Sequence, residues 1–473
     1  MTEPFFPESQ VRQILEALLS TGAEFAELYA EERTPTILTR EDGRLEEASS
    51  GTDRGVGLRI SAGDTEHYAS GNGTSLQGAL ALARALAASL DGAPATALRP
   101  FVPQQAPVRS IVKVPPSSLP LAQRAEVLRR ADGATRAADA RIAQVTATWL
   151  DTVRRVQIAN SEGINESDAV TYLTLAVNAV AKSGNEIRSA YEVVSETSGF
   201  ELLSGDRPEQ VGREAARVAL LQLDAMPAPS GTFPVVVSSS AGGTMIHEAC
   251  GHGFEADFIE KGLSIYAGRM GEQVASPLVT VVDDGTLAQK RGTNRVDDEG
   301  APTSRVLLIE NGVLKSYLHS RRTAVRMKAA RTGNGRRESF RYMPIPRMRN
   351  TMVLPGKTPP GEIIASVKDG ILIADMGGGE VDIVSGNFMF HCPEAYRIRD
   401  GRIAEALRDV TLTGRGPDIL SSIDMVGSDH GFNVGTCGKD GQSAPVADAQ
   451  PTLRIPAIVV GGTGGAGGTE EAA

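Results

Sequence analysis

The chain has 473 residues with ordinary shares of apolar and charged side chains. A single hydrophobic core rarely grows beyond about 250 residues, so two or three domains are expected. The formal net charge of -10 is spread along the sequence and repels the phosphates that dominate nucleic-acid affinity. Nucleic acid is therefore not an expected partner.

The N-terminal part, residues 1–95, is predicted to be an α+β domain. Apolar residues recur at helical spacing over 8–19, and an alanine- and leucine-rich helix is expected over 75–90. Between these helices lie short strand-like runs separated by charged or glycine-containing turns, at 25–30, 36–39, 55–60 and 67–69.

A linker rich in proline and alanine is predicted over 96–120, because prolines disfavour both helix and central strand. A middle α/β unit follows over 121–226. Its helices are expected at 122–138 and 208–223, and its strands at 142–150, 155–159, 170–181 and 186–194.

The remaining segment, 231–460, reads mostly as short strands with glycine turns. A mixed-sheet barrel or sandwich with few helices is predicted there, and the fold class as a whole is α+β. One helix is expected where a strand at 233–237 runs through small residues into Thr244 to Glu248. The glycine-rich tail, 461–473, is predicted to be flexible.

The three cysteines, Cys250, Cys392 and Cys437, form an odd and sparse set that argues against a disulfide framework. The N-terminus lacks a basic segment followed by an apolar run, and no later segment offers about 18 uninterrupted apolar residues. We therefore expect a cytoplasmic protein without a membrane partner.

One stretch departs from the acidic character of the chain. Residues 321–350 carry many arginines among few acidic side chains. A solvated loop is the favoured interpretation, and the alternative is a groove that attracts a carboxylate or a peptide terminus.

The segment His247-Glu248-Ala249-Cys250-Gly251-His252 places two imidazoles five residues apart, one more than in the HExxH of ordinary zinc peptidases. On an ideal α-helix, residues five apart lie about 140° apart around the axis and cannot share one ion. If these histidines bind one metal, the helix must widen to a π-turn or break near Gly251.

A catalytic zinc site usually has a third protein ligand and a water. Cys437 is distinguished by flanking glycines that let the backbone approach an ion, and by Lys439, which could help hold a thiolate. Cys392 is more simply a buried strand residue. The full set of candidates is Cys250, Cys392, Cys437, Glu255, Asp257, His67, His319, His391 and His430.

Four segments together resemble the TldD/PmbA family of peptidases, in its TldD-type, metal-binding branch. They are the HExxxH segment, the run Gly435 to Gln442 (GTCGKDGQ), the run Asp297 to Gly300 before Thr303, and the turn Ile309 to Leu314. The resemblance implies zinc bound by His247, His252 and Cys437, with Glu248 acting in catalysis.

The resemblance further implies a metallopeptidase that admits short or unfolded peptides to a chamber between two subunits. Its partner would be a PmbA-type chain in a heterodimer, or a second copy in a homodimer. No residue in the sequence identifies a substrate-binding pocket.

Two alternatives stay open. The two histidines and a carboxylate such as Glu255 could bind ferrous iron as in an oxygenase. The chain could also be a non-catalytic partner subunit of a peptidase complex.

Overall fold

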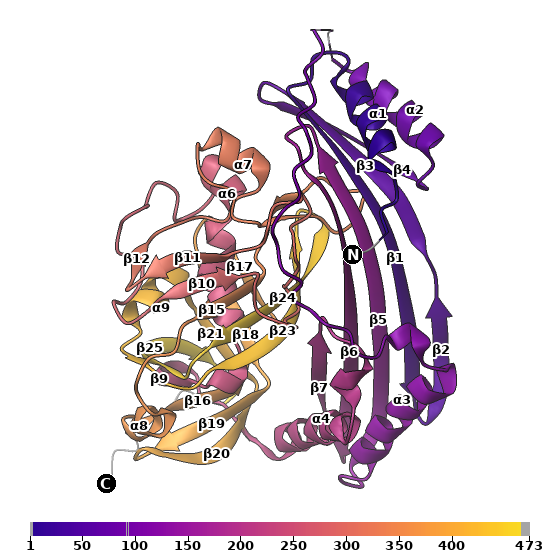
Figure 1. Cartoon of the computed structure of the whole chain (residues 1–473). Helices are drawn as coiled ribbons and strands as arrows, with labels where there is room; N and C mark the ends of the chain where they lie inside the picture. Colours follow the sequence, from indigo (N-terminus) through magenta and orange to yellow (C-terminus); the bar gives the residue numbers. More distant parts are fainter. Residues whose placement is uncertain (1–2, 91, 93, 465–473) are drawn as a thin grey trace, which may run out of the picture.

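The computed structural model describes residues 3–464 apart from 91 and 93. One side of the molecule is a curved sheet of long strands, and the C-terminal part packs against its concave face (Figure 1). Most of the predicted flexible tail, residues 465–473, lies outside the described residues.

The large sheet has seven strands in the order β4-β3-β1-β5-β6-β7, with β2 paired to β1. Its neighbouring strands are antiparallel. The strands are β1 (Phe25–Glu41), β2 (Arg44–Ser50), β3 (Asp53–Ala62), β4 (Thr65–Asn72), β5 (Ile142–Asn160), β6 (Asn165–Ser183) and β7 (Glu186–Glu196). Residues from both predicted N-terminal units thus build one sheet, and the boundary between those units stays a prediction.

Strands β1 and β5 each unite two runs that were predicted as separate strands. Charged residues at or next to the expected breaks pair across the strands and are neutralised there. Arg154 Nε lies 2.7 Å from Glu31 Oε1, and Arg155 Nη1 lies 3.3 Å from Glu32 Oε1. Such cross-strand ion pairs let the ladder continue through a polar stretch.

Four helices flank this sheet, close to their predicted positions. Helices α1 (Glu8–Leu19) and α2 (Leu76–Ala87) pack together at one end, and α3 (Leu121–Arg136) and α4 (Arg207–Asp224) pack together at the other (Figure 1). In α1 the buried residues are Val11, Ile14, Leu15, Leu18 and Leu19, the apolar stripe that predicted the helix.

The C-terminal part contains two mixed sheets, as predicted. The larger has the order β17-β18-β21-β25-β9-β16-β19-β20-β8, with β22 paired to β25, and the smaller has the order β12-β11-β10-β15-β24-β23. Parallel pairs occur between β9 and β16, β8 and β20, and β15 and β24. A two-stranded sheet joins β13 to β14.

The strands of the larger sheet are β8 (Met226–Pro227), β9 (Gly231–Val237), β16 (Asp369–Asp375), β17 (Gly379–Val381), β18 (Asn387–Cys392), β19 (Glu394–Arg399), β20 (Arg402–Arg408), β21 (Val410–Arg415), β22 (Met425–Val426) and β25 (Leu453–Gly461). Those of the other two sheets are β10 (Val281–Asp284), β11 (Arg305–Glu310), β12 (Val313–Leu314), β13 (Gly335–Arg336), β14 (Ile345–Pro346), β15 (Asn350–Val353), β23 (Gly431–Lys439) and β24 (Gln442–Gln450). The helices are α5 (Thr244–Ile246), α6 (Ala256–Glu260), α7 (Arg321–Arg326), α8 (Pro360–Ala365) and α9 (Gly416–Ser422).

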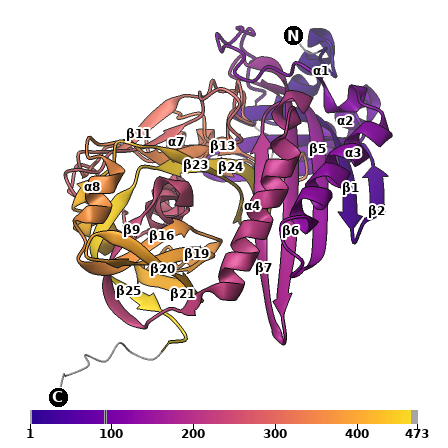
Figure 2. The same cartoon turned by 90° about the horizontal axis from the view of Figure 1, so that it is seen from below.

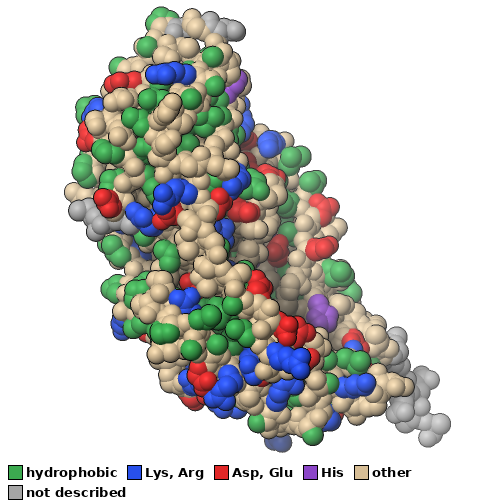
Figure 3. Space-filling model, turned by 90° about the vertical axis from the view of Figure 1, so that its right-hand side faces the viewer, with side chains coloured by type: hydrophobic (Ala, Val, Ile, Leu, Met, Phe, Trp, Pro, Cys, Tyr) green, Lys and Arg blue, Asp and Glu red, His purple; other side chains and the backbone are tan. Residues whose placement is uncertain are grey.

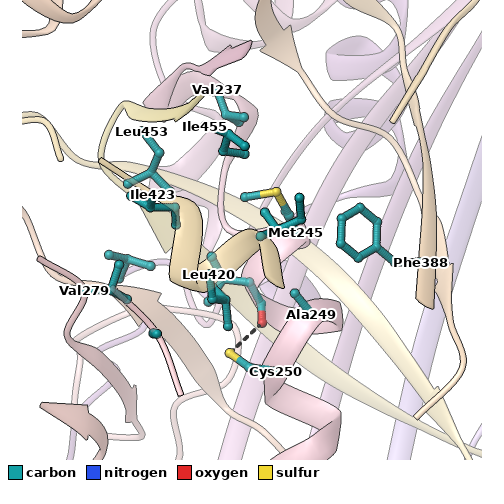
Figure 4. Close-up of a cluster of buried hydrophobic side chains, with 14 of the residues drawn as sticks. Val237, Met245, Ala249, Cys250, Val279, Phe388, Leu420, Ile423, Leu453 and Ile455 are labelled. Carbon is teal, nitrogen blue, oxygen red and sulfur yellow. Dashed lines mark hydrogen bonds between the residues drawn. The ribbon is translucent and has the colours of Figure 1, made fainter. Parts of the chain in front are cut away.

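The helical segment that begins at Thr244 lies inside this part of the molecule, surrounded by strands (Figure 2). It contacts β15 and β24 of the smaller sheet, β17 and β18 of the larger sheet, and α9. Its own buried side chains Met245 and Ala249 share one apolar cluster with Phe388 of β18 and Leu420 of α9, on the side shown in Figure 4. The packing holds the segment rigidly between the two sheets.

The arginine-rich stretch is not the solvated loop that we favoured, because four of its arginines, Arg336, Arg337, Arg347 and Arg349, are buried. Their guanidinium groups donate to backbone carbonyls of neighbouring segments. Arg347 Nη1 donates to Gln442 O at 3.0 Å, and Arg349 Nη1 donates to Gly292 O at 3.0 Å. A rigid fork of donors suits this task, since irregular backbone must have its polar groups satisfied when buried.

Within residues 3–464, no helix is both long and apolar enough to cross a membrane. On the face of the molecule shown in Figure 3, basic and acidic side chains are interspersed.

Candidate metal centre

The helix carrying the two histidines widens, as the spacing required. After α5, residues His247–Gly251 form a π-helix, and His252–Phe254 form a 3-10 turn. The backbone N–H of His252 donates to His247 O, an i to i+5 bond that brings residues five apart onto one face. A Cβ at Gly251 would lie 2.1 Å from Sδ of the buried Met348, so glycine permits this close packing.

Cys437 meets the two histidines from β23. Its Sγ lies 3.3 Å from Nε2 of His247 and 3.3 Å from Nε2 of His252. The three ligand atoms all lie within 4.8 Å of one another, and all three side chains are buried. No other group of three His, Cys, Asp or Glu side chains in the described part of the chain meets the same criterion.

This arrangement fits a tetrahedral zinc ion. Zinc–sulfur and zinc–nitrogen bonds of about 2.3 and 2.0 Å put sulfur and nitrogen ligands about 3.5 Å apart. The observed separations of 3.3 Å are close to that value. Burial raises the pKa of Cys437, but hydrogen bonds with His247 and His252 outweigh burial and lower the pKa to about 4. The sulfur is therefore set up as a thiolate, the form that binds metal.

Glu248 lies beside this cluster without joining it. Its Oε2 is 3.9 Å from His252 Nε2, and its side chain is 18% exposed. Burial raises the pKa of the Glu248 carboxyl, and the nearby His247 and His252 partly offset the rise. A raised pKa suits a carboxylate that must accept and release a proton near neutral pH.

A chain of charged groups supports the ring of His252 from behind. His252 Nδ1 lies 2.9 Å from Glu255 Oε2, and Lys439 Nζ lies 3.0 Å from that same oxygen. Lys439 Nζ also lies 2.7 Å from Asp257 Oδ1. Lys439, which we expected to help hold the sulfur, thus neutralises two carboxylates instead. Burial raises the pKa of Glu255, but Lys439 and His252 lower it to about 2.

Glu255 is therefore not placed as a metal ligand beside the two histidines, the role considered from the sequence. It faces Nδ1 of His252, whereas Cys437 faces Nε2 of the same ring. A carboxylate bound to Nδ1–H fixes the tautomer and orientation of a metal-binding imidazole. Sequence reasoning missed Asp448 on β24, whose Oδ1 accepts a hydrogen bond from Gly243 N at 2.9 Å at the start of this helical segment. Asp448 stands alone among small and apolar neighbours on a strand whose last five residues are all buried, so no motif marks it.

The other candidate ligands lie elsewhere. Cys250 Sγ donates to Ile246 O at 3.2 Å and points into the apolar core, where Figure 4 draws this bond. Cys392 is buried in β18, and burial raises the pKa of both thiols. Nδ1 of His67 bonds Ser89, Nδ1 of His319 bonds Thr323, and His430 makes an edge-to-face contact with Phe432.

The cluster opens into a large cavity of about 1280 Å³. His247, Glu248, His252 and Cys437 line this cavity, together with His391. Three edge strands, β7, β17 and β23, also line the cavity. Edge strands have unpaired backbone N–H and C=O groups, so the cavity walls can pair with another extended chain.

The sequence matches three family descriptions in succession: "PmbA/TldA metallopeptidase domain 1" over residues 26–91, the central domain over 114–223 and the C-terminal domain over 230–462. A protein named "Metalloprotease TldD homolog" from Haemophilus influenzae is 36% identical over 459 residues, covering 95% of each chain. A "Metalloprotease" from Methanothermobacter thermautotrophicus is 37% identical, covering 93% of this chain and 96% of its own. A "Zinc metalloprotease TldD homolog" from Saccharolobus solfataricus is 29% identical over 61% of this chain and 65% of its own.

Solved structures share the fold at low sequence identity. A crystal structure from Thermotoga maritima has a TM-score of 0.79 with 22% identity, covering 96% of this chain and 100% of its own. TldE from Thermococcus kodakarensis has a TM-score of 0.75 with 16% identity, covering 96% and 99%. From the family matches over all three parts and the identity to the relatives, the chain belongs to the PmbA/TldD family of metallopeptidases.

Proposed function

We propose that this protein is a zinc-dependent peptidase in which His247, His252 and Cys437 hold the metal and Glu248 is the catalytic base. The convergence of three buried ligand atoms beside a carboxylate that lines a large cavity carries the proposal. When bound, zinc would acidify a water and polarise the carbonyl of the substrate's peptide bond.

Glu248 would take the proton from the attacking water and later deliver it to the leaving amine. Its position beside Nε2 of His252 keeps it close to the metal-binding atoms, and its raised pKa lets it hold a proton between the two steps. Glu255 would keep the His252 ring oriented, and Lys439 would hold Glu255 ionised.

The edge strands in the wall of the cavity favour extended substrates. A peptide can add to the free edge of β7, β17 or β23 through main-chain hydrogen bonds, which depend little on side-chain identity. Short or unfolded peptides of broad sequence would therefore be preferred, and a folded domain would have to open first.

The working particle would be a cytoplasmic dimer with a PmbA-type chain or with a second copy of this chain. The fold shared with TldE supports this pairing, because two chains of one fold can enclose a common chamber. The ferrous oxygenase considered from the sequence is less well supported, since Glu255 faces Nδ1 of His252 and not the metal-binding side.

Replacing Glu248 by Gln tests the proposal. The variant should retain zinc, since Glu248 is not part of the ligand cluster, and should lose hydrolysis of an unstructured peptide by a factor of at least a hundred. Zinc content and cleavage would be measured on one sample, beside an exposed control, Glu272→Gln. Undiminished cleavage by the Glu248 variant would remove this residue from the mechanism.

A further inference from the structure

A second hollow, of about 300 Å³, lies between the concave face of the large sheet and the C-terminal part. We name it the arginine pocket. On one side it is lined from β1, β5 and β6, and on the other from β13, the segments before and after it, β23 and β24. Five arginines line it, Arg33, Arg154, Arg291, Arg336 and Arg337, against two acidic side chains, Asp298 and Glu338.

Two of the five arginines are already neutralised. Arg154 pairs with Glu31 and Asp298 at 2.7 and 2.9 Å, and Arg337 pairs with Glu27 at 2.5 Å. Arg337 still has Nε and Nη1 buried without a hydrogen-bond partner among the described residues. Its guanidinium lies over the ring of Tyr29, 4.2 Å from the centroid, so the charge of Arg337 is already engaged on both sides.

The other three arginines, Arg33, Arg291 and Arg336, have no carboxylate within ion-pair distance among residues 3–464. Arg336 is 4% exposed, and its Nη atoms donate only to the carbonyls of Met348 and Pro445. Burial lowers the pKa of Arg336 to about 10 and also lowers the pKa of Arg291. Five arginines against two acidic side chains leave an excess of positive charge in this space, which favours the entry of an anion.

Arg291 connects the pocket to the large cavity. Its Nη1 donates to Ser195 Oγ on β7 at 3.2 Å, and its Nη2 donates to Thr436 Oγ1 on β23 at 3.1 Å. Ser195 lines the large cavity, and Thr436 lines both hollows. Because Thr436 precedes Cys437, the guanidinium bridges the two edge strands next to the cluster of His247, His252 and Cys437. Its Nε has no hydrogen-bond partner among the residues that the structure describes.

We propose that the arginine pocket binds the C-terminal carboxylate of a peptide lying in the large cavity. A planar carboxylate matches the forked donors of an arginine, and the volume admits a chain end. The inference rests on the proposed peptidase function and extends it, because it makes the free end of the substrate a recognised group.

Binding would be measured by calorimetry on the zinc-loaded Glu248→Gln protein, which keeps peptides intact. Two unstructured pentapeptides of one sequence would be compared, one with a free carboxylate and one with a C-terminal amide. The free acid should bind about tenfold more tightly, the effect of one charge-assisted hydrogen bond at least. Adding Arg291→Gln should remove this preference, and Arg291→Lys should retain part of it.

Two further variants guard against misfolding and general charge effects. Arg33→Gln, on an exposed residue of the same pocket, should weaken the preference without disturbing the bridge between β7 and β23. Arg305→Gln, on an exposed residue of β11 outside the pocket, should leave it unchanged. Thermal unfolding would check that each variant is folded.

Equal binding of the two peptides would overturn the inference while leaving the proposed function intact. Failure of both peptides to bind would overturn both. Inorganic phosphate would be titrated in parallel, and Arg291-dependent phosphate binding without a preference between the peptides would assign the pocket to a phosphate ligand instead and refute a peptide terminus.

Discussion

The Nδ1–H of His252 donates to Oε2 of Glu255 at 2.9 Å, and Glu255 is fully buried. This bond fixes which nitrogen of the ring faces Cys437. Lys439 compensates the buried charge of Glu255 from the other side, at 3.0 Å.

Replacing Glu255 by Gln should therefore weaken zinc binding by about 10 to 100-fold, the usual effect of losing a carboxylate behind a metal-binding histidine. A competition titration with a zinc chelator measures this. Asp257→Asn is the matched control, because Asp257 also pairs with Lys439 but touches neither histidine, and it should lower the affinity less. An equal loss in the two variants would contradict the orienting role.

The three cysteines should differ sharply in their effect on metal content. Cys437→Ala removes the sulfur that faces both histidines and should strongly reduce bound zinc. Cys250→Ala and Cys392→Ala remove core sulfurs and should leave zinc content unchanged while lowering stability slightly. Metal analysis of the three purified variants is the measurement, and any other ranking would show that Cys437 is not the ligand.

Glu192, on β7 in the wall of the large cavity, should make the protein less stable as pH rises. Burial, with help from Glu214 and Asp375, raises its pKa to about 7 from a usual value of 4.5. Between these two values the unfolded chain loses the proton and the folded chain keeps it, so the free energy of unfolding falls as pH increases.

Glu192→Gln should remove that loss, so that the variant gains about 3 kcal/mol relative to the parent between pH 4 and pH 8. Urea unfolding at several pH values measures the difference. Glu46→Gln, on the exposed strand β2, is the control and should follow the parent. Parallel profiles for the parent and the Glu192 variant would contradict the prediction.

Digestion should follow the unfolded fraction of a protein substrate, because the cluster of His247, His252 and Cys437 is buried at the wall of a cavity lined by edge strands. Opening a folded domain costs about 5 to 15 kcal/mol. A small protein and a destabilised variant with the same residues around its cut sites should be digested in proportion to their unfolded populations. Equal rates would indicate a site open to folded chains.

Light scattering on the active protein should give the mass of a dimer, either of this chain alone or with a PmbA-type partner. An active monomer would refute a chamber shared between two subunits.

Much of the local structure could be predicted from the sequence. The apolar spacing in α1 and the alanine-rich run of α2 depend on contacts between residues three and four apart, which the sequence displays directly. The five-residue spacing of His247 and His252 likewise required the helix to widen if they share an ion, and the π-helix is present.

Some features depended on partners that are distant in the sequence. The expected breaks in β1 and β5 are absent, because Arg154 and Arg155 meet Glu31 and Glu32 across the sheet. The arginines expected in a solvated loop are buried, because carbonyls such as Gln442 O and Gly292 O need donors.

The sequence by itself identified His247, His252 and Glu248 as candidate site residues and showed that the helix must widen if the two histidines share an ion. These inferences depend only on the spacing of neighbouring residues in one helix. Only the tertiary structure brought Cys437, 185 residues from His252 in the sequence, to the Nε2 atoms of both histidines. It also placed Glu255 at Nδ1 of His252. The reason is physical: the direction of a side chain on a distant strand depends on how that strand pairs, and β23 is placed by its register with β24.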